Sequence, residues 1–250
     1  MMDAEKQAHI WDGRQVKRAK DSRYVANRRR IERIAAAIDS MSGSAPKQTI
    51  SVLNIGIGDA RLERILRDRG YDMHAVDPSG DIVTWVRQEL GFDETSAQQC
   101  WAQEMPFPEG HFDFVVMSEV VEHLTPEEMD AVFTEVLRVL KPGGHLIGTV
   151  PENEDLDRER FTCAQCGATS HRVGHEQTFT VQGMRRILGK RFRVVRVERF
   201  RGMYMNGPGV LYYQWIDLPF KFARLLKPNV RAPHQIVFNI FFVAARPRGE

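Results

Sequence analysis

The chain of 250 residues carries 35 Lys and Arg against 33 Asp and Glu, a formal charge of +2, and 42% of its residues are hydrophobic. This composition excludes a disordered chain, and the length is sufficient for one large α/β domain. The charge is unevenly spread: +4 over residues 1–40 (ten basic, six acidic), −13 over 41–184 (eleven and 24) and +11 over 185–250 (fourteen and three).

The cysteine count and the hydropathy pattern argue against a disulfide-rich, a membrane-spanning or a secreted protein. Three cysteines do not make a disulfide framework, so we expect a cytoplasmic protein. The longest nearly apolar run, residues 236–245, contains Asn239 and is too short to span a bilayer. The first residues lack the apolar core of a signal peptide, so we expect no secretory leader.

Helix-like and strand-like segments follow one another along the chain. Residues 5–40 predict two helices, the second with Ile31, Ile34, Ala35 and Ile38 on one face. Strands are expected at residues 50–55, 71–76, 97–102, 112–118, 144–150, 192–200 and 235–246. Helices are expected at about 60–69, 81–90, 126–140 and 181–188. The helix at 126–140 should end at the KPGG that follows, since Pro142 and Gly143 do not continue a helix.

The alternation predicts an α/β fold, a Rossmann-like, doubly wound and mostly parallel seven-stranded sheet. We expect an N-terminal helical cap over residues 1–45 and a core over residues 46–200. A polar, turn-rich insertion occupies residues 151–178, and residues 201–250 supply an aromatic and basic lid segment and the final core strand.

A glycine motif, LNIGIGDARL, lies where the first strand meets the first helix of the core. Gly56 and Gly58 allow a tight turn and a close approach of a ligand, because neither has a Cβ. The same glycines would also suit a strand–helix turn that binds no ligand. Arg61 stands where a dinucleotide fingerprint requires a third glycine, which disfavours NAD.

An acidic residue, Asp77, ends the second expected strand, 21 residues after Gly56. A carboxylate in this position can accept hydrogen bonds from both hydroxyls of a ribose. It can also cap the following helix, and the two roles can coexist.

These motifs resemble those of the class I S-adenosylmethionine-dependent methyltransferases, particularly the broad group typified by the ubiquinone-biosynthesis methylases. The resemblance runs from residue 52 to about 188 and rests, in order, on VLNIGIGDARL, HAVDPS, AQEMPFPEGHFDFVVMSEVVEHL and LRVLKPGGHLIGTVP. The set is specific as a whole, although each motif alone is weak.

The resemblance implies contacts with S-adenosylmethionine. It assigns Gly56 and Gly58 to the methionine part of the cofactor and Asp77 to the ribose. The adenine would lie along Trp101, Ala102 and Gln103. Two positions depart from the family: Asn54 replaces an acidic residue and cannot pair with the cofactor's ammonium group, and Trp101 stands where an acidic residue is frequent.

The insertion contains CAQCGATSHRVGH, a C-x2-C-x4-H-x3-H spacing. Two thiolates and two imidazoles suit tetrahedral Zn²⁺, and a complete set of four protein ligands indicates a structural ion. The predicted ligands are Cys163, Cys166, His171 and His175. The alternative is a pair of free thiols with ordinary loop histidines.

Three polar residues, Glu119, Glu122 and His123, follow the fourth expected strand, on the edge where open α/β sheets bind ligands. We assign Glu119 to the cofactor side and Glu122 and His123 to catalysis, with His123 as a base for an acceptor hydroxyl. The alternative is that His123 only packs or caps the loop. Cys100 is expected to be a small buried residue of the third strand.

The basic segment at residues 185–201 indicates either a solvated sheet edge or an anionic partner. Strict alternation would put Arg193, Val195, Val197 and Arg199 on one face of the strand. Residues 212–227, YYQWIDLPFKFARLLK, suit a substrate lid or a weak contact with a membrane surface. No segment matches a nucleic-acid module.

The sequence therefore predicts methyl transfer from S-adenosylmethionine, at oxygen, to a small-molecule or sugar acceptor, with Zn²⁺ as a structural ion. The basic C-terminal part of the chain favours an anionic acceptor. The alternatives are N- or C-methylation, or a non-catalytic binding module.

Overall fold

A computed structural model of the chain describes residues 28–162, 169–171, 173–201 and 238–248, together with Val16 and Ala19. Within these ranges the helices are α3 (Arg28–Ser42), α4 (Arg61–Asp68), α5 (Gly80–Leu90), α6 (Pro126–Val139) and α7 (Val181–Leu188). The strands are β1 (Ser51–Ile55), β2 (Asp72–Asp77), β3 (Ala97–Gln99), β4 (Phe112–Ser118), β5 (Leu140–Pro151), β6 (Arg160–Thr162), β7 (Thr169–His171), β8 (Arg193–Arg201) and β9 (Phe238–Ala245). Short 3₁₀ turns are η1 (Lys47–Thr49), η2 (Val121–His123) and η3 (Leu156–Glu159).

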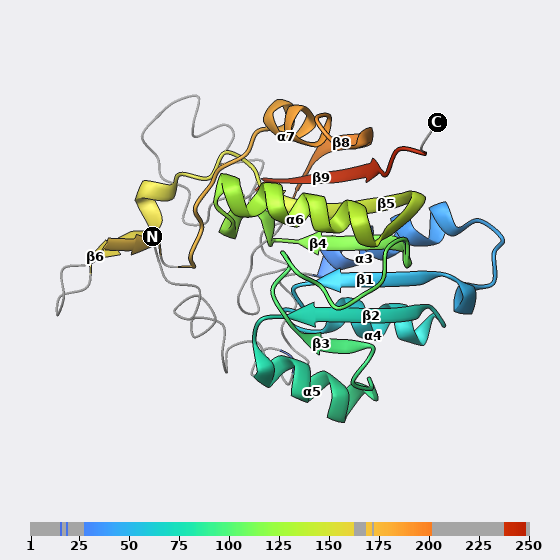
Figure 1. Cartoon of the computed structure of the whole chain (residues 1–250). Coiled ribbons are helices and arrows are strands. Elements are labelled where there is room, and N and C mark those ends of the chain that lie inside the picture. Colours follow the sequence, from blue (N-terminus) through green and yellow to red (C-terminus); the bar gives the residue numbers. More distant parts are fainter. Residues whose placement is uncertain are drawn as a thin grey trace, which may run out of the picture.

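Seven of these strands form one sheet in the order β3-β2-β1-β4-β5-β9-β8. Strands β1 to β5 are parallel, and β9 runs antiparallel between β5 and β8 (Figure 1). The predicted Rossmann-like, mostly parallel sheet is confirmed. The carboxyl ends of β1, β2 and β4 point to one edge, and the separate β6–β7 hairpin lies beyond that edge (Figure 1). The loops at this edge therefore lie close together.

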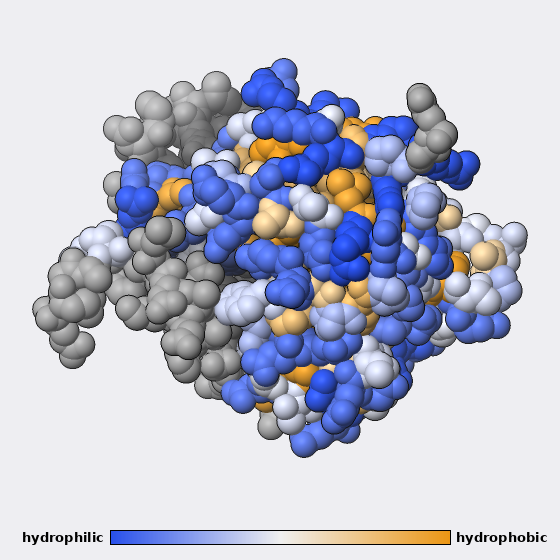
Figure 2. Space-filling view, in the orientation of Figure 1, coloured by the Kyte–Doolittle hydropathy of each residue, from blue (hydrophilic) through white to orange (hydrophobic). Residues whose placement is uncertain are grey.

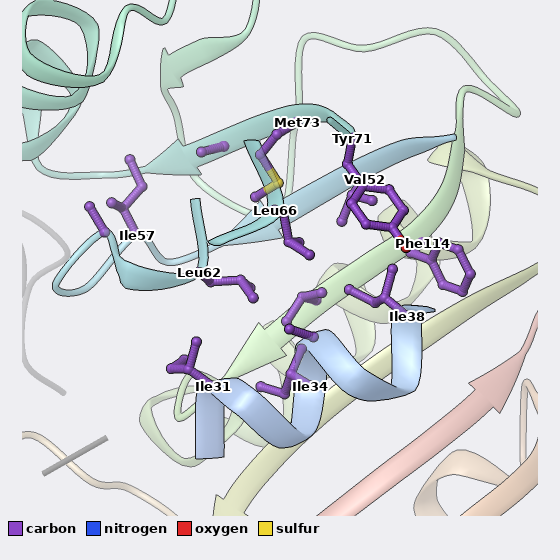
Figure 3. Close-up of a cluster of buried hydrophobic side chains, with 14 of the residues drawn as sticks. Ile31, Ile34, Ile38, Val52, Ile57, Leu62, Leu66, Tyr71, Met73 and Phe114 are labelled. Atoms are coloured by element: carbon purple, nitrogen blue, oxygen red, sulfur yellow. The ribbon is translucent and has the colours of Figure 1, made fainter. Parts of the chain in front are cut away.

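Hydrophobic side chains bind helices to both faces of the sheet. On one face, Ile31, Ile34 and Ile38 of α3 pack towards α4, β1 and β4 (Figure 3), and α5 joins the same cluster. Helices α6 and α7 supply the cluster on the other face. The face of α3 that the sequence predicted is buried, and each fully buried isoleucine contributes about 1.5–3 kcal/mol to folding.

Helix α6 begins at a capping box just after η2. The Thr125 hydroxyl accepts the Glu128 N–H at 3.2 Å, and the Glu128 carboxylate accepts the Thr125 N–H at 2.8 Å. Such a box satisfies two backbone donors that the helix leaves open, and it fixes where the chain turns after η2.

Helix α6 ends at the KPGG segment as predicted, but the strand that follows begins earlier than the expected residue 144. Helix α6 ends at Val139, and β5 begins at the next residue. Leu140 pairs with Phe112, but the next pair is Phe114 with His145, so residues 141–144 form a bulge inside the strand. Gly143 there has φ +79°, a conformation that glycine adopts without strain.

Strand β8 also departs from strict alternation. Val194 pairs with Ala244 and Arg196 with Val243, so a bulge leaves Val195 outside the pairing. Val194 and Val197 therefore pack on the same cluster, and Val195 is 46% exposed. The prediction that Arg193, Val195, Val197 and Arg199 share one face is wrong, because the extra residue reverses the alternation.

Several predictions fall outside the described residues: the zinc ligands Cys163 and Cys166, and the lid segment at residues 212–227. The described part of the chain has no helix that is both long and apolar enough to cross a membrane. Figure 2 shows one face of the molecule, where hydrophilic residues predominate between small hydrophobic patches.

Candidate active site

The glycine loop, residues 56–60, joins β1 to α4 at the edge where the parallel strands end. Gly56 has φ +83° and Gly58 has φ +61°, both in the left-handed region that favours glycine. A Cβ built on Gly56 would lie 2.8 Å from Cγ2 of Val120, whereas one on Gly58 would meet none of the described heavy atoms within 4 Å. The loop is thus packed against the end of β4 at Gly56 and borders open space at Gly58.

Asp77 ends β2 and connects the glycine loop to α5. Its side chain is buried, and its carboxylate accepts the Ile57 N–H at 2.8 Å and the Ser79 N–H at 2.9 Å. Ser79, not Asp77, occupies the N-cap position of α5. Asp77 therefore holds the glycine loop in place, at the position where the resemblance puts the ribose.

Asn54 and Glu63 form a buried pair beneath the glycine loop. The Asn54 amide donates to Glu63 Oε1 at 2.6 Å and to the Gly56 carbonyl at 3.0 Å. Burial raises the pKa of Glu63 to about 8. Asn54 Oδ1 and Glu63 Oε2 are buried, with no hydrogen-bond partner among the described residues. Asn54 thus supports the loop from below, and Glu63 is a residue that the sequence analysis missed.

The segment after β3 provides the surface assigned to adenine. Strand β3 ends at Gln99, so Cys100 follows the strand instead of belonging to it. The Cys100 N–H donates to the Asp77 carbonyl at 3.3 Å, and burial raises the pKa of the Cys100 thiol to about 12. Trp101 is 41% exposed and Ala102 is half-buried. Their role at the adenine stays a prediction.

Glu119, directly after β4, joins three distant parts of the chain. It has φ +59°, and its carboxylate accepts hydrogen bonds from Thr149 at 2.9 Å and from Asn239 at 3.0 Å. Arg30 of α3 forms an ion pair with it at 3.1 Å. A left-handed non-glycine residue is strained, and these contacts hold it in place. Glu119 therefore ties α3, β5 and β9 together beside the site.

Three imidazoles, His123, His171 and His175, meet beyond η2, and we call them the histidine cluster. The ring centroids of His123 and His175 lie 4.7 Å apart, and those of His171 and His175 lie 4.9 Å apart. His123 Nδ1 lies 3.0 Å from the Gly174 carbonyl. A carbonyl only accepts, so Nδ1 carries the proton and the ring lone pair is on Nε2. Burial lowers the pKa of His123 to about 3.

Two carboxylates border the histidine cluster. Glu122 is fully buried, and neither of its carboxylate oxygens has a hydrogen-bond partner among the described residues. Burial, reinforced by the charge of Glu119, raises the pKa of Glu122 well above its usual range. Glu154, which the sequence analysis missed, lies 2.5 Å from Nδ1 of His175. The structure thus brings His123 together with His171 and His175, which lie far from it in the sequence.

The fold and this edge define the class of protein. A seven-stranded sheet with an antiparallel β9, a glycine loop after β1 and an acidic residue ending β2 are the features of a class I S-adenosylmethionine-dependent methyltransferase. Residues 53–148 match the family model described as "Methyltransferase domain". The class predicted from the sequence is confirmed.

Known proteins agree with this class. The ubiquinone/menaquinone biosynthesis C-methyltransferase of Vibrio parahaemolyticus is 33% identical over 112 residues, which are 42% of this chain and 42% of that protein. The tRNA N(3)-cytidine methyltransferase of Gallus gallus is 23% identical over 214 residues, 76% of this chain and 55% of that protein. The matches thus span about half or less of these relatives' length.

Solved structures share the fold. The 1,6-didemethyltoxoflavin-N1-methyltransferase of Burkholderia thailandensis, with bound S-adenosylhomocysteine, has a TM-score of 0.61 at 16% identity, covering 99% of this chain and 92% of that one. The N-methyltransferase NodS of Bradyrhizobium japonicum, also with S-adenosylhomocysteine, has a TM-score of 0.58 at 15% identity, with 97% of each chain covered. At these identities the likeness concerns the fold alone.

Proposed function

We propose that this chain transfers the methyl group of S-adenosylmethionine to an oxygen of a small-molecule or sugar acceptor. The observation that carries the proposal is the hydrogen bond between the glycine loop and Asp77, at the carboxyl ends of β1 and β2. Open α/β sheets bind ligands at this edge. Two structural neighbours of the same fold hold S-adenosylhomocysteine.

The residues present fit the cofactor. The open space at Gly58 admits a ligand against the backbone, and the buried Asp77 holds the loop at the position where the resemblance puts the ribose. When bound, S-adenosylmethionine supplies a methyl group that is activated for displacement by its attachment to a sulfonium. The protein then contributes chiefly by placing the acceptor in line with that methyl group.

The acceptor would bind after the carboxyl end of β4, beside Glu122 and His123. With its proton on Nδ1, the neutral His123 ring has a lone pair on Nε2 that can take a proton from an acceptor hydroxyl. Burial raises the pKa of Glu122 well above its usual range, which favours the protonated carboxyl group, and in that form it can donate a hydrogen bond to an acceptor oxygen. An anionic acceptor would be favoured by the basic charge of residues 185–250.

We also propose a structural zinc ion in the insertion, with Cys163, Cys166, His171 and His175 as the ligands that the sequence indicates. Support comes from the stacking of His171 on His175, with 4.9 Å between ring centroids. Both cysteines lie outside the described residues.

The first test is calorimetry of the purified chain with S-adenosylmethionine and S-adenosylhomocysteine. We expect binding of one equivalent. No detectable binding would contradict the enzyme and favour a non-catalytic module. Labelled methyl transfer to hydroxyl, amine and carbon acceptors then decides the atom, because the similar proteins named above are C- and N-methyltransferases.

A change of His123 to Gln tests the acceptor side. We expect turnover to fall about 100-fold, the lower range for loss of a general base, with unchanged affinity for S-adenosylmethionine. His111→Gln, at the amino end of β4 and so at the opposite edge of the sheet, is the matched control. Undiminished turnover in His123→Gln would exclude a part for His123 in the reaction.

A further inference from the structure

The loop before α7 is fastened to η2 by backbone hydrogen bonds. The Glu122 carbonyl accepts the N–H of Glu176 at 2.8 Å and that of Gln177 at 3.3 Å. The Gln177 amide donates to the Leu124 carbonyl at 2.6 Å. These contacts place His175 directly against Glu122 and His123. The ligand atoms of Glu122, His123 and His175 lie within 4.8 Å of one another.

Both histidines of this group have one ring nitrogen engaged in a hydrogen bond. Nδ1 of His123 donates to the Gly174 carbonyl at 3.0 Å, and Nδ1 of His175 lies 2.5 Å from the Glu154 carboxylate. Each neutral ring therefore has its lone pair on Nε2. A histidine that ligates a metal generally donates its other ring N–H to a carboxylate or a backbone carbonyl in this way, which fixes the tautomer and the orientation of the ring.

The third member of the group, Glu122, provides an independent indication of a ligand. Its side chain is 0% exposed, and both carboxylate oxygens are buried with no hydrogen-bond partner among the described residues. A buried polar group without a partner is unfavourable by at least about 1–3 kcal/mol. A cation held between this carboxylate and the two imidazoles would remove that cost.

We propose that Glu122, His123 and His175 bind a divalent transition-metal ion, with Glu154 positioning His175. Two imidazoles and one carboxylate favour zinc, iron or cobalt over calcium and magnesium, which prefer oxygen ligands. Three protein ligands leave a coordination position for an oxygen of the acceptor. Because a bound cation lowers the pKa of an oxygen ligand, the ion itself would promote deprotonation of an acceptor hydroxyl. With Nε2 of His123 bound to the ion, the proton would pass to solvent instead of to His123.

This inference rests on the proposed methyl transfer only for the ion's role, and it differs from the zinc site of the insertion in its ligands. The two sites share His175 alone. Since Glu154 engages Nδ1 of His175, Nε2 is the one nitrogen available to an ion. The inference assigns that nitrogen to the group at η2, which would leave Cys163, Cys166 and His171 as the protein ligands of the zinc ion in the insertion.

The test is titration of the chelator-treated, full-length protein with Co²⁺, whose visible spectrum reports its ligands. We expect binding of Co²⁺ with visible bands that persist in the double variant Cys163→Ser, Cys166→Ser.

Glu122→Gln should abolish these bands while keeping the fold, because glutamine has the same shape as glutamate but lacks the carboxylate that would bind the ion. Glu154→Gln should weaken Co²⁺ binding about 10- to 100-fold, as expected for a residue that orients a ligand. Glu176→Gln, an exposed carboxylate next to His175, is the matched control and should bind as the parent does.

Equal Co²⁺ affinity in the parent and in Glu122→Gln would overturn the inference. So would a spectrum consisting of a thiolate-to-cobalt charge-transfer band that disappears in the double cysteine variant, a result that would support the zinc site of the insertion. Circular dichroism of each variant checks the fold. Calorimetry with S-adenosylmethionine is run on the same samples: failure of cofactor binding with intact Co²⁺ binding would contradict the proposed function and leave the metal site standing.

Discussion

The glycine loop and the histidine cluster lie at the same edge of the sheet, but different groups hold them in place. At the glycine loop, the carboxylate of Asp77 is satisfied by backbone N–H groups at 2.8 and 2.9 Å. At the histidine cluster, backbone carbonyls hold the chain in place by accepting hydrogen bonds. The ligand atoms of His123, His175 and the buried Glu122 lie close to one another. The first arrangement is fixed before any ligand arrives, whereas the second concentrates groups that can take up a proton or an ion.

Glu63 is the exception to this contrast, because it is a buried titratable group under the glycine loop, and its replacement should have the largest effect on stability. Its pKa of about 8 in the folded protein lies above the ordinary 4.5, so its favourable contribution is complete below pH 4.5 and is lost as the pH rises to about 8. Relative to Glu63→Gln, the parent should lose about 4 kcal/mol of unfolding free energy over that interval. Urea unfolding of both proteins at pH 5 and pH 8 measures the difference.

The control for this change is Glu89→Gln, at an exposed site on α5. It should follow the parent at both pH values. If the gap between Glu63→Gln and the parent is the same at pH 5 and pH 8, the pKa of Glu63 is not raised in the folded protein.

Asp77→Ala should have the next largest effect, because it leaves the buried N–H groups of Ile57 and Ser79 without their acceptor. We expect a loss of about 2–4 kcal/mol in unfolding free energy, taking about 1–2 kcal/mol for each lost bond. Affinity for S-adenosylmethionine should fall about 100-fold, since the loop loses its anchor. Denaturation and calorimetry measure the two effects. The control is Asp81→Ala, at an exposed acid in the first turn of α5, which should change neither the unfolding free energy nor the cofactor affinity. If Asp77→Ala binds S-adenosylmethionine as tightly as the parent, Asp77 does not have this role.

Alanine substitutions at Gly56 and Gly58 show which of the two glycines is packed against the protein and which borders the ligand. We expect their effects on stability to be the smallest of those predicted here. Gly58→Ala should cost about 1–2 kcal/mol of stability, because alanine is strained at φ +61°. Gly56→Ala should cost more, because its Cβ would also lie 2.8 Å from Val120. Gly58→Ala should nevertheless weaken cofactor binding, since its methyl group enters the open space. Thermal unfolding and calorimetry test the pair; the reverse order of stability would contradict this account of the loop.

The sequence predicted the order of strands and helices well because each has its own hydrophobic period. It missed the bulges in β5 and β8, which depend on pairing with residues distant in the chain, in β4 for β5 and in β9 for β8. Gly56, Gly58 and Asp77 were predictable because local turns require those residue types. Glu63 was not, since only the packing of α4 places it under Asn54.

Glu154 was missed for a related reason. It follows Asn153, which has φ +50° and donates its N–H to the Phe179 carbonyl at 2.8 Å. This turn directs Glu154 towards His175, and no periodicity near residue 154 indicates it. The spacing of His171 and His175 predicted that the two rings would meet, but not that His123 would join them.

The position of β9 has a consequence for how the protein is made. Strand β9 enters the sheet between β5 and β8, although both precede it in the chain (Figure 1). Until residues 238–245 emerge from the ribosome, β5 and β8 each lack this neighbour, and Glu119 lacks the amide of Asn239. Unpaired strand edges promote association with other chains. The sheet next to the acceptor side of the site is therefore completed only after both of the strands that flank β9 have been synthesised.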